Sequence, residues 1–104
     1  MDKQNADGIS ISVSDGLIVF TPSKYRAQPG ESVSWTCAEG PFAIQFFGIS
    51  PLETCDAQSE RGNQAHGNVR RDAMAGIYPY ACAVFADRRV YLDANCPAII
   101  IDQP

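Results

Sequence analysis

The sequence predicts an all-β domain, a Greek-key β-sandwich that carries one short helix. Short runs in which apolar and polar residues alternate recur along the chain, and this is the period of strands with one buried face. Turn-forming residues separate the runs at intervals that are typical of a sandwich. The 104 residues, of which 45% are hydrophobic, suit a single core. We therefore expect one domain over residues 9–104, preceded by a flexible segment over residues 1–8.

The first half of the chain contains four expected strands. In residues 9–14, isoleucine and valine alternate with serine, and residues 17–20 return after an Asp15-Gly16 turn as the second strand of a hairpin. Residues 32–37 and 42–46 follow, and each run places its large apolar side chains on one face. The residues that share one face of the run 32–37 are Val33, Trp35 and Cys37.

A long polar segment occupies residues 48–75. So long a stretch without structure is rare in a compact domain, so we expect part of it to be ordered. Ser50 suits the N-cap of a helix, with Pro51 in its first turn, and the spacing predicts a short helix that extends to about Ser59. We expect residues 62–67 to be mobile.

Alternation resumes in the last third of the chain. Tyr78, Tyr80 and Cys82 belong to one alternating run, and an Asp87-Arg88 turn leads into a returning strand at residues 90–92. Residues 98–101 form the last expected strand. Its consecutive isoleucines predict burial on both faces, or one face covered by a partner.

Composition excludes several classes of partner. The net charge is −4 and the pI is near 4.7, so nucleic acid and anionic membranes are poor partners. No apolar run approaches the ~20 residues of a spanning helix. We expect a monomer that can bind a protein partner.

Localisation is predicted from the cysteines. No apolar stretch follows Met1 as a signal peptide would require, so two readings remain: a cytosolic protein or the mature form of a secreted or periplasmic protein. Four cysteines in a small, strand-rich chain favour the second, because disulfides persist in oxidising compartments.

Three short motifs resemble the cupredoxin family. They are Phe-Thr-Pro at residues 20–22, Pro-Gly-Glu-Ser-Val-Ser-Trp at 29–35 and Gly-Ile-Tyr-Pro-Tyr-Ala-Cys at 76–82. The resemblance implies a cupredoxin-like sandwich in which Cys82 stands at the position of the copper thiolate. Phe42 stands near the position of a histidine ligand, and Cys96 lies near that of the axial methionine.

The residues needed for a blue-copper site are missing. Such a site takes two imidazoles and one thiolate with a weak axial donor. The chain has a single histidine, His66, and Met74 is its only methionine besides Met1. We therefore expect no copper and no other cofactor. A rival reading is a redox or Cu(I)-handling accessory protein with a rearranged site. Its candidate ligands are Cys82, Cys96, Met74 and His66.

The four cysteines are candidates for disulfides. They are too widely spaced for the usual structural zinc pairs, and no Cys-x-x-Cys motif is present. The cupredoxin resemblance implies Cys82–Cys96 and Cys37–Cys55. Residues 29–37 and 80–82 also resemble an immunoglobulin domain, and that fold would demand Cys37–Cys82 instead.

No catalytic residue is predicted. The carboxylates are scattered, and His66 has no candidate nucleophile near it in the pattern. We expect a non-enzymatic binding or assembly module whose specific role is unknown, with contacts on loops and strand edges. Phe47 and Phe85 are out of phase with the core residues of their strands, so each is either exposed or buried under the segment 48–75. The interaction candidates are Phe47, Ile49, Phe85, Arg88 and Arg89.

Overall fold

The computed structural model describes residues 8–59, 63–93 and 96–102. Residues 1–7 of the segment expected to be flexible lie outside these ranges. Every element in the described part of the chain is a β-strand, in the order β1 (Ile9–Ser14), β2 (Leu17–Thr21), β3 (Lys24–Ala27), β4 (Ser32–Cys37), β5 (Phe42–Phe46), β6 (Asp56–Gln58), β7 (Gln64–Asn68), β8 (Gly76–Ala86), β9 (Arg89–Leu92) and β10 (Ala98–Ile101). Among the described residues, no helix is long and apolar enough to cross a membrane.

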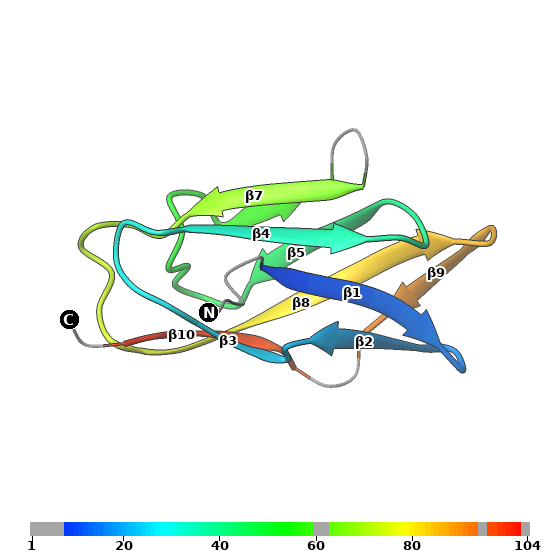
Figure 1. The fold of residues 1–104 in the computed structure, drawn as a ribbon, viewed down its shortest axis with the longest axis horizontal. Helices are drawn as coiled ribbons and strands as arrows, with labels where there is room; N and C mark the ends of the chain where they lie inside the picture. The colour runs from blue at the N-terminus through cyan, green and yellow to red at the C-terminus, as the bar shows by residue number, and fades with distance from the viewer. Residues whose placement is uncertain (1–7, 60–62, 94–95, 103–104) are drawn as a thin grey trace, which may run out of the picture.

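The strands form two sheets that pack as a sandwich (Figure 1). One sheet has the order β2-β1-β4-β7 and the other the order β3-β10-β8-β5-β6, with β9 paired to the second half of β8. Two pairings are parallel, β1 with β4 and β3 with β10, and the other pairings are antiparallel. The all-β sandwich predicted from the alternating pattern is therefore confirmed.

The predicted hairpins are confirmed together with their turns. Ser14 pairs with Leu17, and the two residues between them, Asp15 and Gly16, have positive φ. Ala86 pairs with Arg89 in the same way across the Asp87-Arg88 turn. Positive φ at both central residues defines the tight turn whose twist matches that of a hairpin.

Aromatic rings fill the middle of the core. The Tyr80 ring on β8 makes edge contacts with Phe20, Trp35 and Phe46, which come from β2, β4 and β5. The Trp35 Nε1–H donates a hydrogen bond of 3.3 Å to the Tyr80 hydroxyl. This contact joins the two sheets at their centre and satisfies the polar atoms of both buried rings.

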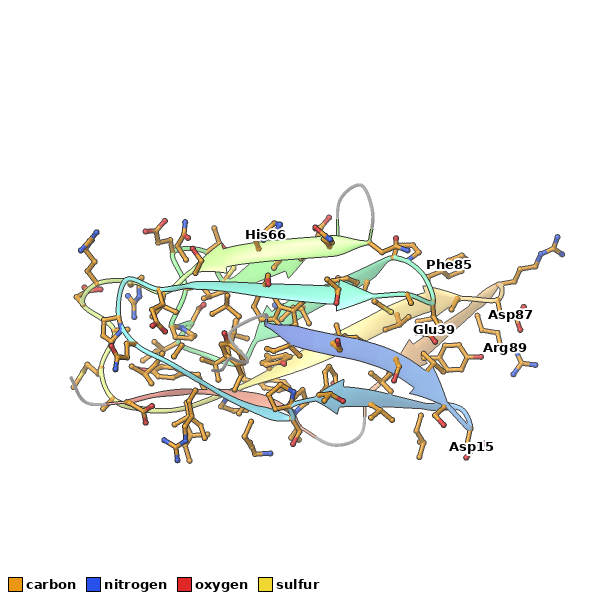
Figure 2. All side chains as sticks on the ribbon, viewed as in Figure 1. Asp15, Glu39, His66, Phe85, Asp87 and Arg89 are labelled. Carbon is orange, nitrogen blue, oxygen red and sulfur yellow. The ribbon has the colours of Figure 1, made fainter. Side chains whose placement is uncertain are left out.

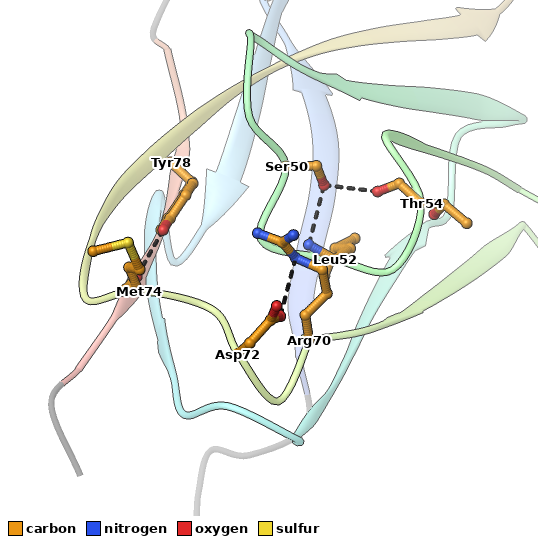
Figure 3. A network of polar contacts seen from close by, with 7 residues as sticks. All are labelled: Ser50, Leu52, Thr54, Arg70, Asp72, Met74 and Tyr78. Atoms are coloured by element: carbon orange, nitrogen blue, oxygen red, sulfur yellow. Dashed lines mark hydrogen bonds and ion pairs between the residues drawn. The ribbon is translucent and has the colours of Figure 1, made fainter.

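The predicted helix from Ser50 is wrong. The Ser50 hydroxyl accepts a hydrogen bond from the Leu52 N–H and donates one to the Thr54 carbonyl, which closes a compact loop (Figure 3). Serine side chains that bond nearby backbone compete with helix formation in this way. The chain then returns beside β5 as the short strand β6.

The predicted mobility of residues 62–67 is wrong for the described residues 63–67. Residues 64–68 form β7, which pairs antiparallel with β4 along its whole length. Ala65 is buried opposite Trp35, and a Cβ on Gly67 would lie 2.6 Å from Leu52 Cδ1. Small residues therefore allow β7 to pack closely against the loop that follows β5.

The isoleucines of the last strand are explained by its place in the sheet. β10 lies between β3 and β8, and Ile99 and Ile101 are buried while Ile100 is partly buried. Burial within the fold therefore accounts for this run without a partner.

Candidate functional site

Cys82, which the resemblance implies at the thiolate position, is enclosed by the core. Its side chain is 3% exposed and lies on the inward face of β8, between Tyr80 and Val84. Burial raises the pKa of the Cys82 thiol to about 12, and the charges of Asp93 and Cys37 act in the same direction. The thiol is therefore protonated at neutral pH and is a weak nucleophile.

The Asp93 carboxylate holds the backbone around Cys82. The Cys82 N–H donates to Asp93 Oδ2 at 2.8 Å, and the Asp93 N–H donates to the Cys82 carbonyl at 3.1 Å. The other carboxylate oxygen, Oδ1, accepts the Cys96 N–H at 3.1 Å. The backbone segments around Cys82 and Cys96 are thus linked through one side chain, although the Cys82 side chain points inward and Cys96 is exposed.

An apolar residue stands where the resemblance implies a histidine ligand. Phe42 is buried at the start of β5 and pairs with Val84, two residues from Cys82. The only histidine lies elsewhere. His66 on β7 pairs with Ser34 and is exposed on the outer face of its sheet, as Figure 2 shows. A whole sheet therefore lies between His66 and the Cys82 thiol.

The structure does not bring the alternative metal ligands together. Met74 is 76% exposed in the segment before β8, where its carbonyl accepts the Tyr78 hydroxyl at 2.7 Å (Figure 3). Cys82 lies on β8, in the half of that strand farther from Met74, and Cys96 is exposed. Across residues 8–59, 63–93 and 96–102, no group of three or more His, Cys, Asp or Glu side chains could hold a metal ion.

All four cysteines are free thiols in the structure. Cys37 and Cys82 are buried, and Cys55 and Cys96 are exposed. Each pairing implied by the resemblance would join one buried and one exposed residue. The two buried cysteines lie on different sheets, Cys37 at the end of β4 and Cys82 on β8, and both face the core.

The interaction candidates fall into two separate groups. Phe47 and Ile49 are exposed after β5, near Pro79, whose carbonyl accepts the Phe47 N–H. Phe85, Arg88 and Arg89 are exposed at the β8–β9 hairpin, at the other end of β8 (Figure 2). These groups cannot be separated from the sequence alone, because the strand pairing that places them joins residues far apart in the chain.

Sequence reasoning missed two residues of the second group. Val90 pairs with Phe85, and Leu92 pairs with Ala83, so these side chains share the outer face of β8 and β9. Both Val90 and Leu92 are exposed. Their alternation with Tyr91 was visible in the sequence, but only the register shows that they continue the surface of Phe85.

We call this surface the hairpin face and define it by Phe85, Val90 and Leu92 together with the alanines Ala43, Ala81 and Ala83. Two shallow hollows, of about 250 and 330 Å³, lie side by side on it. Both are lined by Ala43, Ala83 and Gln58, and the exposed apolar side chains stand on one side of them. Small residues on β5 and β8 form their floor because Ala43 pairs with Ala83.

Comparison with solved structures identifies the fold. The chain is similar to a purple cupredoxin from Nitrosopumilus maritimus, with a TM-score of 0.58 and 18% identity over 91% of this chain and 98% of that one. It is also similar to an amicyanin variant in the Cu(I) state, with a TM-score of 0.53 and 14% identity over 96% of this chain and 87% of the other. A second amicyanin variant, in its reduced Cu(I) form at pH 4, gives 0.52 and 12%. No protein-family model and no curated protein matches the sequence. These likenesses confirm the predicted cupredoxin-like fold in preference to the immunoglobulin alternative.

Proposed function

We propose that this chain is a non-enzymatic protein-binding module on a cupredoxin-like scaffold that has lost its copper site. The inventory of ligands supports the loss of copper. The sequence has one histidine where a blue-copper site takes two, and His66 lies on the outer face of a sheet, away from Cys82. Phe42 fills the vacated position with apolar packing.

The exposed apolar side chains of the hairpin face support the binding role. Monomeric proteins rarely expose several neighbouring large apolar side chains without a use for them. Phe85, Val90 and Leu92 are adjacent by strand register and border hollows that can take apolar side chains. The face therefore suits a protein partner better than a charged polymer or a lipid surface.

The charge beside the hairpin face suggests what the partner presents. Arg88 and Arg89 are exposed at the hairpin turn, and neither forms an ion pair with another described residue. Together with the exposed Asp87 that precedes them, the two arginines leave one net positive charge at this turn, in a chain of net charge −4. We infer a partner that presents apolar side chains flanked by a carboxylate.

The alternative Cu(I)-handling role lacks support of this kind. The Cys82 side chain points into the core, whereas Cys96 is exposed, Met74 is exposed before the start of β8, and His66 lies on the outer face of the other sheet. We also propose an oxidising compartment, periplasmic or extracellular, as the site of action. The four cysteines in so small a domain support it.

The test compares two pairs of exposed apolar residues. The measurement is a pull-down with each variant. The Phe85→Ser/Val90→Ser variant is expected to lose binding of the partner protein that the wild type captures, and the Leu17→Ser/Val19→Ser variant on β2 is expected to keep it. All four side chains are exposed, so both variants should keep the wild-type melting temperature. Equal capture by both variants would contradict the proposed surface. Light scattering on each variant distinguishes a second copy of the chain from a different partner.

A further inference from the structure

The two buried cysteines occupy matching positions on facing strands. β4 and β8 belong to different sheets and run in the same general direction in Figure 1. Cys37 is 2% exposed and Cys82 is 3% exposed, and each side chain faces the space between the sheets. The proposed docking role uses neither thiol.

Two contacts place the cysteines beside one another. The ring centroids of Trp35 and Tyr80 are 5.9 Å apart, and their polar atoms are hydrogen-bonded. Cys37 and Cys82 each lie two residues further along the same strand and on the same face, because side chains alternate. Three residues beyond them, a Cβ on Gly40 would lie 2.2 Å from the Phe85 carbonyl oxygen. The two cysteines thus lie between the ring contact of Trp35 with Tyr80 and the close backbone approach of Gly40 to Phe85.

The chain crosses between the two sheets close to the cysteines. After Cys37 the chain crosses to the other sheet within a few residues, and Phe42 then pairs with Val84 next to Cys82. Packed sheets are normally ~10 Å apart, whereas a disulfide needs Cα atoms within about 7 Å. A disulfide therefore requires these two strands to lie closer than that normal spacing, and a short crossing beside the two cysteines favours such an approach. The Cys37 thiol is also one of the groups that raise the pKa of Cys82, which agrees with their proximity.

We propose that Cys37 and Cys82 form a disulfide between the two sheets when the protein folds in an oxidising compartment. This inference goes beyond the docking role and does not depend on it. It also replaces both pairings that the cupredoxin resemblance implied. The sulfur at the copper-thiolate position would then be bound to sulfur and could not ligate a metal.

The oxidant is a small-molecule disulfide such as glutathione disulfide. One cysteine thiolate attacks it, forming a mixed disulfide and releasing one glutathione thiolate. The second cysteine then attacks the mixed disulfide, closes the Cys37–Cys82 bond and releases the second glutathione. Two protein thiols lose two electrons and two protons, and the glutathione disulfide is reduced to two thiols. Because both cysteines are buried after folding, this exchange takes place while the chain folds.

The rival pairing is Cys82–Cys96, since Asp93 bonds the backbone of both residues. The direction of the side chains opposes it: Cys82 points into the core, and Cys96 is exposed. Cys55 is also exposed, so we expect Cys55 and Cys96 to keep reactive thiols.

The test is oxidative refolding of the whole chain. Reduced, denatured protein is refolded in a mixture of reduced and oxidised glutathione, alkylated, and digested without reduction. Cleavage after Glu39 separates Cys37 from Cys55, and cleavage after Arg88 separates Cys82 from Cys96. We expect a Cys37–Cys82 peptide pair. A Cys82–Cys96 pair, or four alkylated cysteines, would overturn the proposal.

A second measurement avoids variants in the core. In a Cys55→Ser/Cys96→Ser variant only the proposed pair remains, so refolding should leave no reactive thiol after denaturation. Reduction of that variant should lower its melting temperature by more than about 10 °C. Two reactive thiols and an unchanged melting temperature would overturn the proposal independently of the peptide map.

Discussion

At the scale of single residues, Cys82 illustrates how burial changes a side chain's chemistry. The same thiol on the protein surface would titrate near its ordinary pKa of 9.0, but inside the sandwich its pKa rises to about 12. The charged form is disfavoured because the core offers it no solvation and no cation. A residue that resembles a metal ligand in the sequence is therefore a protonated core residue in the reduced structure.

This shift predicts how stability depends on pH in the reduced protein. Above pH 9 the unfolded thiol loses its proton while the folded thiol keeps it, so the unfolded state binds fewer protons. The free energy of unfolding should then fall as pH rises from about 9 to about 12. Cys82 contributes a slope of about 1.4 kcal/mol per pH unit in that window.

Urea titrations followed by the fluorescence of Trp35, with a reductant present, measure this slope. A Cys82→Ala variant should lose the part of the slope that comes from the Cys82 thiol. Some pH dependence should remain, because burial also raises the pKa of the Tyr80 hydroxyl. A Cys55→Ser variant, with an exposed thiol replaced, should keep the whole slope. Identical slopes in wild type and Cys82→Ala would contradict the assignment.

At the scale of elements, the two hairpins show the same turn built from different residues. The turn between β1 and β2 uses Asp15 and Gly16, and the turn between β8 and β9 uses Asp87 and Arg88. In both turns the second central residue has positive φ, which glycine adopts without a steric penalty and arginine does not. The β8–β9 turn therefore carries strain that the β1–β2 turn avoids.

Arg88→Gly should accordingly stabilise the protein by about 0.5–1 kcal/mol. The substitution relieves about 1–2 kcal/mol of strain at the left-handed position. This gain exceeds the free-energy cost that arises because glycine makes the unfolded chain more flexible. Arg89→Gly is the matched control, because Arg89 lies within β9 and pairs with Ala86. That change should destabilise the protein by about 0.5–1 kcal/mol. Chemical denaturation of both variants measures the difference, and a loss of stability in Arg88→Gly would count against the turn assignment.

At the scale of the whole molecule, the sandwich separates the residues that could bind copper. The core surrounds Cys82, the sheet that contains β7 carries His66 on its outer face, and Met74 precedes the start of β8. The paired sheets hold these positions apart, since moving His66 to Cys82 would require breaking the β4–β7 ladder.

Copper addition tests this arrangement. Cu(II) added to the folded protein should not produce the intense thiolate-to-copper absorption of a blue site, because two imidazoles are not available to one ion. The control is the same titration after denaturation and reduction, where exposed thiols react with copper without forming that band. An intense band that disappears in Cys82→Ser would show that the copper site is retained.

Several features could be predicted because they depend on neighbouring residues. Alternation in residues 9–14 and 76–86 reports which face of a strand is buried, and the Asp15-Gly16 turn fixes its hairpin locally. The count of histidines limits metal chemistry whatever the fold. The helix from Ser50 failed at this same local level, since a capping pattern is also compatible with a loop and residues 56–58 became a strand only by pairing with β5.

The amino-acid pattern alone predicts a strand-rich sandwich without the ligands of a blue-copper centre. The three-dimensional fold is needed to show which strands adjoin: that β4 lies parallel to β1, that β7 completes its sheet, and that Val90 and Leu92 extend the surface of Phe85. It also placed Trp35 against Tyr80, from which we infer that Cys37 lies near Cys82. Local periodicity records the burial of each face, whereas pairing and register depend on contacts between residues far apart in the chain, which no local pattern encodes.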